Sequence, residues 1–301
     1  MADALAIETQ RLSKTYPNGV EALVDLDLRV ERGEVFGYLG PNGAGKSATI
    51  RCLLDLIRPT VGSGRILGVE VGTVEARRHV GYLPGDARLA DRLTGREQLE
   101  SFARLRGGVD DAFRDELVRR FDCVLDRPIR ELSKGNRQKL GIVQAFMHRP
   151  EVLILDEPTG GLDPLVQSEF RALARQTAAD GRSVFLSSHT LDEVQHIADR
   201  VGIIRGGRLI DVDSVESLRE RALRHVTIRF AERVDSSAFE NLDGVRVEHA
   251  EAQVVRLQAP ETAMDAVVKV AAQHPVVDLV SQPADLEEIF LELYRDGDGR
   301  G

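Results

Sequence analysis

One glycine-rich stretch decides the fold: Gly40-Pro41-Asn42-Gly43-Ala44-Gly45-Lys46-Ser47. It fits the Walker A pattern, whose glycines let consecutive backbone N–H groups point inward around an anion at the positive end of a helix. Lys46 can then reach the outer phosphates of a nucleotide, and the Ser47 hydroxyl can bind Mg²⁺. The stretch therefore predicts a nucleoside-triphosphate site rather than an ordinary turn.

The segments on both sides of the loop supply the strand and helix that such a loop requires. Residues 34–39 (EVFGYL) lead into it, and a helical stretch follows as far as about Leu56. Further upstream, residues 23–30 (LVDLDLRV) alternate between apolar and charged side chains. A period of two predicts one half-exposed strand there.

A second motif carries two neighbouring carboxylates. Residues 152–155 (VLIL) are all apolar and are followed directly by Asp156 and Glu157. By itself this pattern is typical of a solvated strand end. Paired with the glycine loop it predicts a Walker B, in which Asp156 lies near the metal and Glu157 orients or deprotonates the attacking water.

The rest of the first 217 residues alternates between helical and extended patterns. This order predicts a largely parallel sheet covered on both faces, an α/β fold of the P-loop NTPase class that occupies residues 1–217. The expected helices span 97–106, 110–121, 136–148, 164–179 and 191–198, and the expected later strands span 152–155, 183–187 and 201–205.

The pattern of expected helices and strands changes from about Leu218, which predicts a second, small α+β domain over residues 218–301. Its expected order is β-α-β-β-α-β, the ferredoxin-like pattern. A final helix is expected over 285–294. The four strands are expected at 225–230, 245–248, 254–258 and 276–281, and the two helices between them at 236–242 and 263–273.

The remaining motifs follow in the order found in ABC-type ATPases, which the chain resembles. The run Leu132-Ser133-Lys134-Gly135-Asn136 resembles the family's signature, usually written LSGGQ. In the family this signature completes the ATP site of the opposite subunit, so the resemblance assigns Ser133, Gly135 and Asn136 to nucleotide binding. Seen alone, Ser133 would be an ordinary helix N-cap.

The resemblance extends to three single residues. Asp163, in a Gly-Gly-Leu-Asp run, matches the loop that crosses the family's dimer interface, although an N-cap before a proline explains it equally well. His189 matches the switch histidine that contacts the terminal phosphate in the family. A single histidine after a strand is usually structural, and only its position downstream of Glu157 favours the role at the phosphate. Tyr16 matches the aromatic residue that stacks on adenine, and an exposed strand tyrosine is the alternative.

The sequence departs from the family pattern in three places: after the glycine loop, at Gly85-Asp86 and in the signature. Ala48 stands where a threonine is usual, and Gly85-Asp86 stands where a glutamine normally touches Mg²⁺. Either Asp86 or water would then complete the metal shell. The signature carries Lys134 and Asn136 in place of glycine and glutamine. Losing one hydrogen bond to a charged phosphate costs about 1.5–3 kcal/mol, so these changes predict a working but slow enzyme.

The resemblance implies an ATPase that uses ATP and Mg²⁺, works as a homodimer or with a paralogue, and drives separately encoded transmembrane permease subunits. Residues 285–291 (DLEEIFL) are similar to the C-terminal domain of bacterial drug and antibiotic exporters. Two alternatives stay open: a non-transport ABC protein acting on ribosomes or DNA, and a nucleotide-binding regulator with weakened catalysis.

Composition limits the partners and the compartment. The chain has 301 residues and a net charge of −9, which argues against an electrostatic grip on nucleic acid. Its two cysteines, Cys52 and Cys123, have no metal-ligand spacing and are expected to be buried in a reducing cytosol. Residues 1–10 lack signal-peptide features, and apolar runs are too short to cross a bilayer. We expect a cytoplasmic protein, peripheral on the inner face of the cell membrane.

Overall fold

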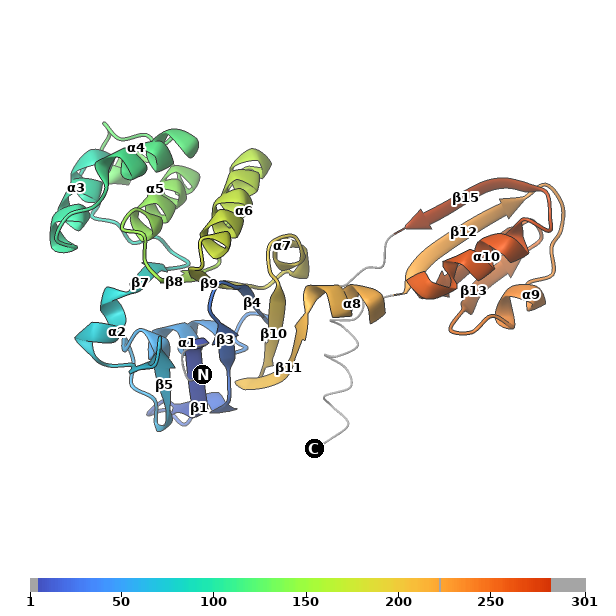
Figure 1. The fold of residues 1–301 in the computed structure, drawn as a ribbon, viewed down its shortest axis with the longest axis horizontal. Helices are drawn as coiled ribbons and strands as arrows, with labels where there is room; N and C mark the ends of the chain where they lie inside the picture. The colour runs from blue at the N-terminus through green and yellow to red at the C-terminus, as the bar shows by residue number, and fades with distance from the viewer. Residues whose placement is uncertain (1–4, 222, 283–301) are drawn as a thin grey trace. The chain divides into compact units, whose positions relative to one another are not determined.

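The computed structural model describes residues 5–221 and 223–282 of the chain (Figure 1). It separates into two units, residues 1–212 and residues 213–301. In the described residues, no helix is both long enough and apolar enough to cross a membrane.

A six-stranded sheet forms the centre of the first unit. Its order is β11-β10-β4-β9-β8-β7, and the five strands from β10 to β7 are parallel. The two central strands β4 and β9 are buried along their whole length. Burial on both faces accounts for the apolar side chains of β4 and of the centre of β9, residues 184–186. The serines of β9 are buried as well, and their hydroxyl groups form hydrogen bonds. The strands are β4 (Val35–Leu39), β7 (Val80–Leu83), β8 (Val152–Asp156), β9 (Ser183–Ser188), β10 (Arg200–Arg205) and β11 (Arg208–Ser214).

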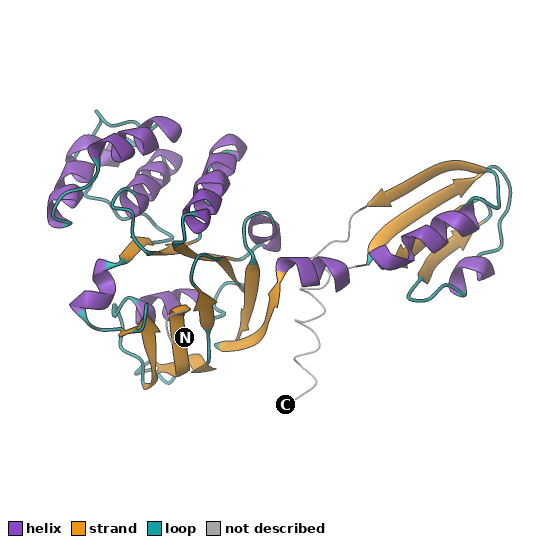
Figure 2. Cartoon of the chain, in the orientation of Figure 1, coloured by secondary structure: helices purple, strands orange, loops and turns teal. Residues whose placement is uncertain are grey.

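Helices follow these strands as the alternating pattern predicts (Figure 2). Helices α1 and α7 pack on the central sheet, and α3 and α4 form a helical group with α5. A capping box between Thr94 and Glu97 fixes the start of α3. The helices are α1 (Lys46–Leu53), α2 (Val74–Arg78), α3 (Gly95–Leu105), α4 (Asp111–Arg120), α5 (Lys134–Phe146), α6 (Pro164–Ala179) and α7 (Leu191–Gln195).

A second sheet in this unit corrects one prediction. Residues 23–30 do not form one strand, because β2 (Glu21–Leu26) ends before β3 (Arg29–Glu31) begins. The buried Thr9 hydroxyl causes the break: it donates to the Leu26 carbonyl at 2.7 Å and accepts from the Leu28 N–H at 2.9 Å, taking the place of strand pairing. The remaining strands of this sheet are β1 (Leu5–Thr15), β5 (Val61–Ile66) and β6 (Val69–Glu70).

The second unit contains a four-stranded antiparallel sheet in the order β13-β14-β12-β15. Phe230 and Phe239 lie in its own apolar core. The helix expected over 285–294 lies outside the described residues. In chain order the elements are α8 (Val215–Arg221), β12 (Arg224–Phe230), α9 (Ser237–Glu240), β13 (Arg246–Glu251), β14 (Val254–Ala259), α10 (Met264–Ala271) and β15 (Val276–Gln282).

Candidate functional site

The glycine loop lies between β4 and α1, and its backbone can be formed only with glycine at key positions. Gly45 has φ +114°, a left-handed conformation, and a Cβ there would lie 2.7 Å from the carbonyl oxygen of Ala22. Helix α1 begins at the next residue, Lys46, so the first N–H groups of this helix face the loop. Ala48 is buried within the same helix.

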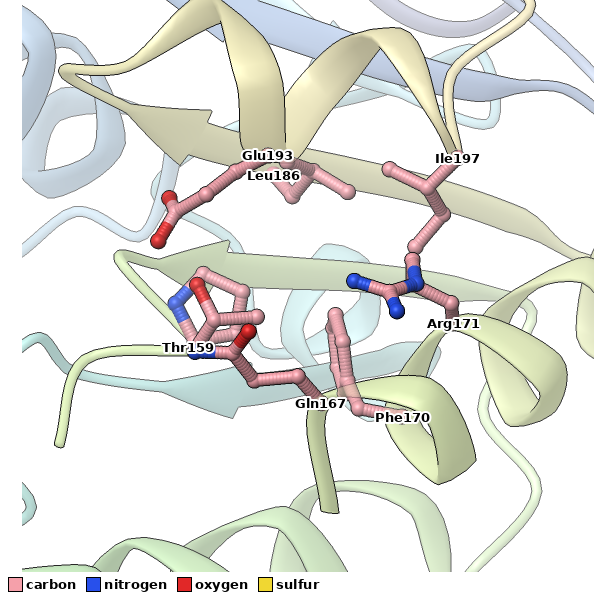
Figure 3. Close-up of a pocket in the computed structure, with 8 residues that line it drawn as sticks. Thr159, Gln167, Phe170, Arg171, Leu186, Glu193 and Ile197 are labelled. Carbon is pink, nitrogen blue, oxygen red and sulfur yellow. The ribbon is translucent and has the colours of Figure 1, made fainter. Parts of the chain in front are cut away.

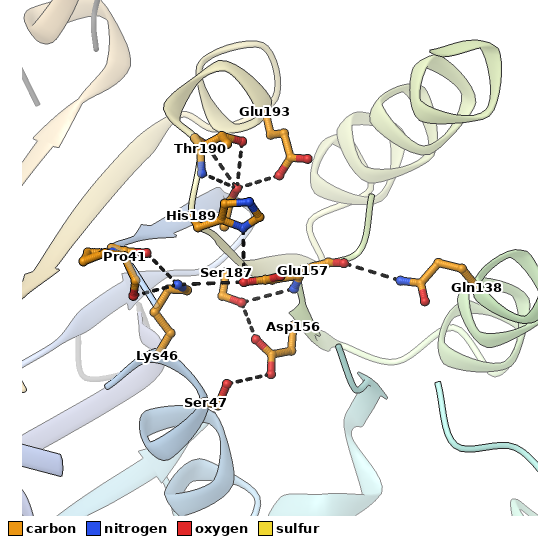
Figure 4. Close-up of polar contacts among 12 residues, drawn as sticks. Pro41, Lys46, Ser47, Gln138, Asp156, Glu157, Ser187, His189, Thr190 and Glu193 are labelled. Atoms are coloured by element: carbon orange, nitrogen blue, oxygen red, sulfur yellow. Dashed lines mark hydrogen bonds and ion pairs between the residues drawn. The ribbon is translucent and has the colours of Figure 1, made fainter. Parts of the chain in front are cut away.

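Lys46 lies folded over its own loop. Its side chain is only 6% exposed, and Nζ donates to the carbonyl oxygens of Gly40 at 2.5 Å and Pro41 at 3.2 Å (Figure 4). Burial lowers the pKa of Lys46, while Glu157 and Asp156 act in the opposite direction. The ammonium group is therefore partly removed from water and lies beside two carboxylates, where its charge acts strongly on an anion.

Asp156 is held by two hydroxyl groups from different elements. Its Oδ2 accepts from Ser47 Oγ of α1 at 3.0 Å, and its Oδ1 accepts from Ser187 Oγ of β9 at 2.5 Å. Strand pairing places Asp156 directly opposite Ser187. Sequence reasoning gave Ser187 no role. The sequence feature that could have pointed to Ser187 is its position at the end of the strand expected over 183–187 in the parallel sheet.

Glu157 is where the site's charged groups meet. Its Oε1 lies 3.8 Å from Lys46 Nζ and 3.3 Å from His189 Nδ1. Its backbone has φ +47°, a strained conformation for a non-glycine residue, and its N–H bonds to both the carbonyl and the hydroxyl of Ser187. This turn aims the carboxylate away from the strand and toward the loop.

A buried glutamine, also missed from the sequence, links this turn to α5. Gln138 is only 2% exposed, and its amide donates to the carbonyl oxygens of Pro158 at 2.9 Å and Glu157 at 3.4 Å. The signature helix is therefore tied to the Walker B turn within one chain. Its signal in the sequence was weak, since a glutamine inside an amphipathic helix is normally solvated.

The other predicted binding residues lie elsewhere on the described chain. Ser133 caps α5 and accepts the N–H of Asn136 at 3.2 Å, while Asp163 caps α6 and accepts the N–H of Val166 at 3.0 Å. The capping roles considered for these two residues are therefore real. Gly135 approaches the Asp163 loop so closely that a Cβ would lie 2.9 Å from the carbonyl oxygen of Gly161.

Tyr16 follows directly after β1. It occupies a turn in which its N–H donates to the carbonyl oxygen of Val20 at 2.9 Å. Its half-buried ring has Lys14 Nζ 5.5 Å from the centroid. One face of the ring is therefore next to a cation, and the tyrosine lies in a turn instead of in the strand considered as the alternative.

A groove of about 520 Å³ opens beside the carboxylates, where the family pattern expects a glutamine. Gly85 lines it, and a Cβ there would lie 3.6 Å from Asp156 Oδ2. The next residue, Asp86, has an 85% exposed side chain paired with Arg88 at 3.7 Å. Gly85 therefore offers no side chain toward Asp156, while Asp86 lines the same groove.

A glycine loop between a strand and a helix, facing two carboxylates at the end of a nearby parallel strand, defines a P-loop nucleotide-binding protein. The family model described as ABC transporter matches residues 23–160. The daunorubicin resistance ATP-binding protein DrrA3 of Streptomyces coeruleorubidus is 34% identical over 98% of both chains. The chain belongs to the ATP-binding proteins of the ABC transporter family.

Other relatives agree with this assignment over about two thirds of the chain. An uncharacterised ABC transporter ATP-binding protein of Synechocystis sp. is 37% identical over 69% of this chain, and the match spans 62% of that relative's length. A solved structure described as the ATP-binding subunit of an ABC transporter superposes with a TM-score of 0.66 at 32% identity. The match covers 71% of this chain and 92% of the chain in that structure.

Proposed function

We propose that this chain is an ATPase that powers export through separate membrane-spanning subunits. One observation carries the proposal: Lys46 and His189 converge on the Glu157 carboxylate, next to the pair formed by Ser47 and Asp156. These are the groups that phosphoryl transfer to water requires, namely a cation, a carboxylate near the attacking water and oxygen ligands for a metal.

The oxygen atoms of Ser47 and Asp156 fit Mg²⁺, which prefers hard oxygen ligands and keeps several waters. Bound there, Mg²⁺ would offset the negative charge on the outer phosphates. Ser187 holds Asp156 in position for this role through its hydroxyl. Gly85 offers no side chain on the side of the groove, so Asp86, which lines the same groove, or water would complete the metal shell there.

In the proposed mechanism, Lys46 exchanges its bonds to the loop carbonyls for the outer phosphates of ATP. Glu157 orients and deprotonates the attacking water, and His189 positions the terminal phosphate from the other side. Tyr16 stacks on adenine through its half-buried ring. The loop from Gly40 to Ala48, including Asn42, Gly43 and Ala44, surrounds the phosphates, and its backbone N–H groups donate to them; Pro41 has no N–H and only shapes the loop.

We further propose a head-to-tail dimer, either of two copies or with a paralogue. Ser133, Gly135 and Asn136 would then bind the nucleotide held by the opposite subunit, and Asp163 would cross the interface. Their position at the starts of α5 and α6, apart from Lys46, supports a contribution to a second site. ATP stabilises the closed dimer because it contacts both subunits only in that state.

The similarity to DrrA3, a daunorubicin resistance ATP-binding protein, supports a role in drug or antibiotic export. We propose that the chain lies on the cytoplasmic face of the membrane, in contact with the permease and not with nucleic acid. We assign residues 1–217 to the ATPase domain. The strand order of the second unit supports a ferredoxin-like domain over 218–301.

Purification of the full chain, expressed alone or together with the membrane proteins encoded beside it, tests the proposal. The full chain should co-purify with a multi-span membrane protein, and phosphate release should rise at least severalfold in that complex. Co-purification with ribosomes instead would favour a non-transport ABC protein. Nucleotide binding without phosphate release, even in the complex, would favour a regulator and contradict the proposed ATPase.

A further inference from the structure

The loop that carries His189 is closed by a buried hydroxyl group. Ser188, the last residue of β9, is fully buried, and its Oγ accepts the N–H of Thr190 at 3.0 Å. The hydroxyl thus bridges the two residues on either side of His189. This small turn fixes the backbone from which the imidazole projects.

The same hydroxyl is anchored to the following helix. Its oxygen lies 2.5 Å from Glu193 Oε2 and 3.0 Å from the carbonyl oxygen of Thr190 (Figure 4). A hydroxyl has one hydrogen to donate, and a carboxylate accepts more strongly than a neutral carbonyl. The shorter contact therefore takes the hydrogen, so Glu193 holds the turn to α7.

Glu193 is half-buried at the edge of a small cavity, which Arg171 also lines. Its carboxylate borders a cavity of about 10 Å³, opposite Thr159 and Gln167 of the neighbouring segments (Figure 3). Within the described residues, Ser188 is the hydrogen-bond donor that the structure gives this carboxylate. A half-buried carboxylate with a single strong donor holds that donor in a narrow range of geometry.

His189 depends on this turn because its side chain is otherwise loosely held. The side chain is 48% exposed, and among residues 5–221 and 223–282 the ion pair that the imidazole forms is the 3.3 Å approach of Nδ1 to Glu157 Oε1. The direction of the ring therefore follows from the backbone of residues 188–190. A displacement of even about 1 Å at a reacting group can lower a rate by up to ~100-fold.

We propose that Glu193 is a positioning residue, which acts through the Ser188 hydroxyl to aim His189 at the terminal phosphate and at Glu157. The inference deepens the proposed ATPase function and rests on it. We assign Glu193 no contact with the nucleotide or the metal. Its effect on hydrolysis passes entirely through the turn around His189.

Three variants and a matched control separate this role from a structural one. Glu193→Ala removes the anchor, Glu193→Asp withdraws the carboxylate by one methylene, and Glu193→Gln keeps an oxygen that can accept the hydrogen bond. The control is Asp192→Ala. Asp192 is the neighbouring carboxylate on α7, but it accepts from Gln195 at 2.8 Å and faces His196 at 3.4 Å, away from Ser188.

Steady-state hydrolysis by the full chain is expected to sort these variants. Glu193→Ala and Glu193→Asp should lower kcat by roughly 10- to 100-fold with a much smaller change in KM for ATP, since a misplaced His189 affects the reacting phosphate while the other contacts to the nucleotide remain. Glu193→Gln should stay within about threefold of the parent, and Asp192→Ala within about twofold. An unchanged kcat in both shortened variants overturns the proposal. Glu193→Asp decides the point if Glu193→Ala does not fold.

A double-mutant cycle tests whether Glu193 affects hydrolysis through His189. In a His189→Ala background, Glu193→Ala should cause no further loss, because the group it positions is gone. An equal loss in both backgrounds contradicts the inference. A second readout needs no turnover: the imidazole NMR signals of His189, assigned with His189→Ala, should shift or broaden in Glu193→Ala and not in Asp192→Ala. If the parent releases no phosphate, the proposed ATPase fails, while unchanged imidazole signals in Glu193→Ala would reject the positioning role separately.

Discussion

Lys46→Met is expected to abolish detectable hydrolysis and to weaken the binding of Mg-ATP by roughly 10- to 100-fold, the value of one or two charge-assisted hydrogen bonds to phosphate. Methionine keeps the length of the buried stem and removes the ammonium group. Glu157 and Asp156 then face the triphosphate without the cation that lies 3.8 Å from Glu157. Binding is measured by calorimetric titration, and hydrolysis by phosphate release.

The control for Lys46→Met is Lys269→Met, since Lys269 is an exposed lysine of α10 that pairs with Asp265 at 2.6 Å. It should bind and hydrolyse ATP like the parent. Thermal unfolding shows whether Lys46→Met remains folded, as expected from the conserved stem volume. Parent-like affinity and turnover in Lys46→Met would remove the lysine from the site.

Glu157→Gln is expected to separate binding from chemistry. The amide fills the same space but cannot accept a proton from water, so kcat should fall by about 10²- to 10⁴-fold, the usual contribution of a general base. The variant should still bind Mg-ATP. Since hydrolysis no longer opens the sandwich, a dimer should accumulate with ATP and Mg²⁺, measurable by light scattering after size-exclusion chromatography.

Glu151→Gln is the matched control for Glu157→Gln. Glu151 lies just before β8, six residues from Glu157 on the same segment, and pairs at the surface with His79 at 2.8 Å. It should hydrolyse ATP normally and form no ATP-dependent dimer that persists. Hydrolysis at the parent rate by Glu157→Gln contradicts the role given to this carboxylate.

The parts of the site that depend on local sequence patterns could be predicted. Residues 40–47 and the apolar run before Asp156 each define a strand end, and parallel strands bring their carboxyl ends to one edge of a sheet. The structure brings Lys46, Asp156, Glu157 and His189 together at this edge. The family comparison agrees with the resemblance seen in the motifs.

The parts that depend on pairing between distant segments could not be predicted. Ser187 acquires its role only because β9 lies beside β8, and Gln138 only because α5 packs behind the Walker B turn. The break in residues 23–30 depends on the Thr9 hydroxyl, which comes from a strand 17 residues away. The positioning role proposed for Glu193 could not be predicted from the sequence, since a glutamate in a short helix is normally solvated.

The most direct test is the Mg²⁺ dependence of ATP binding by the purified full chain, alone and with its membrane partners, compared with Asp156→Asn and Lys46→Met. We predict saturable binding that is strongest with Mg²⁺, loses much of its Mg²⁺ dependence in Asp156→Asn, and is weakened in Lys46→Met with or without the metal. Binding that is indifferent to Mg²⁺ and to both substitutions, or no binding under any of these conditions, would contradict a site in which the lysine and the carboxylates meet on one metal-bound triphosphate.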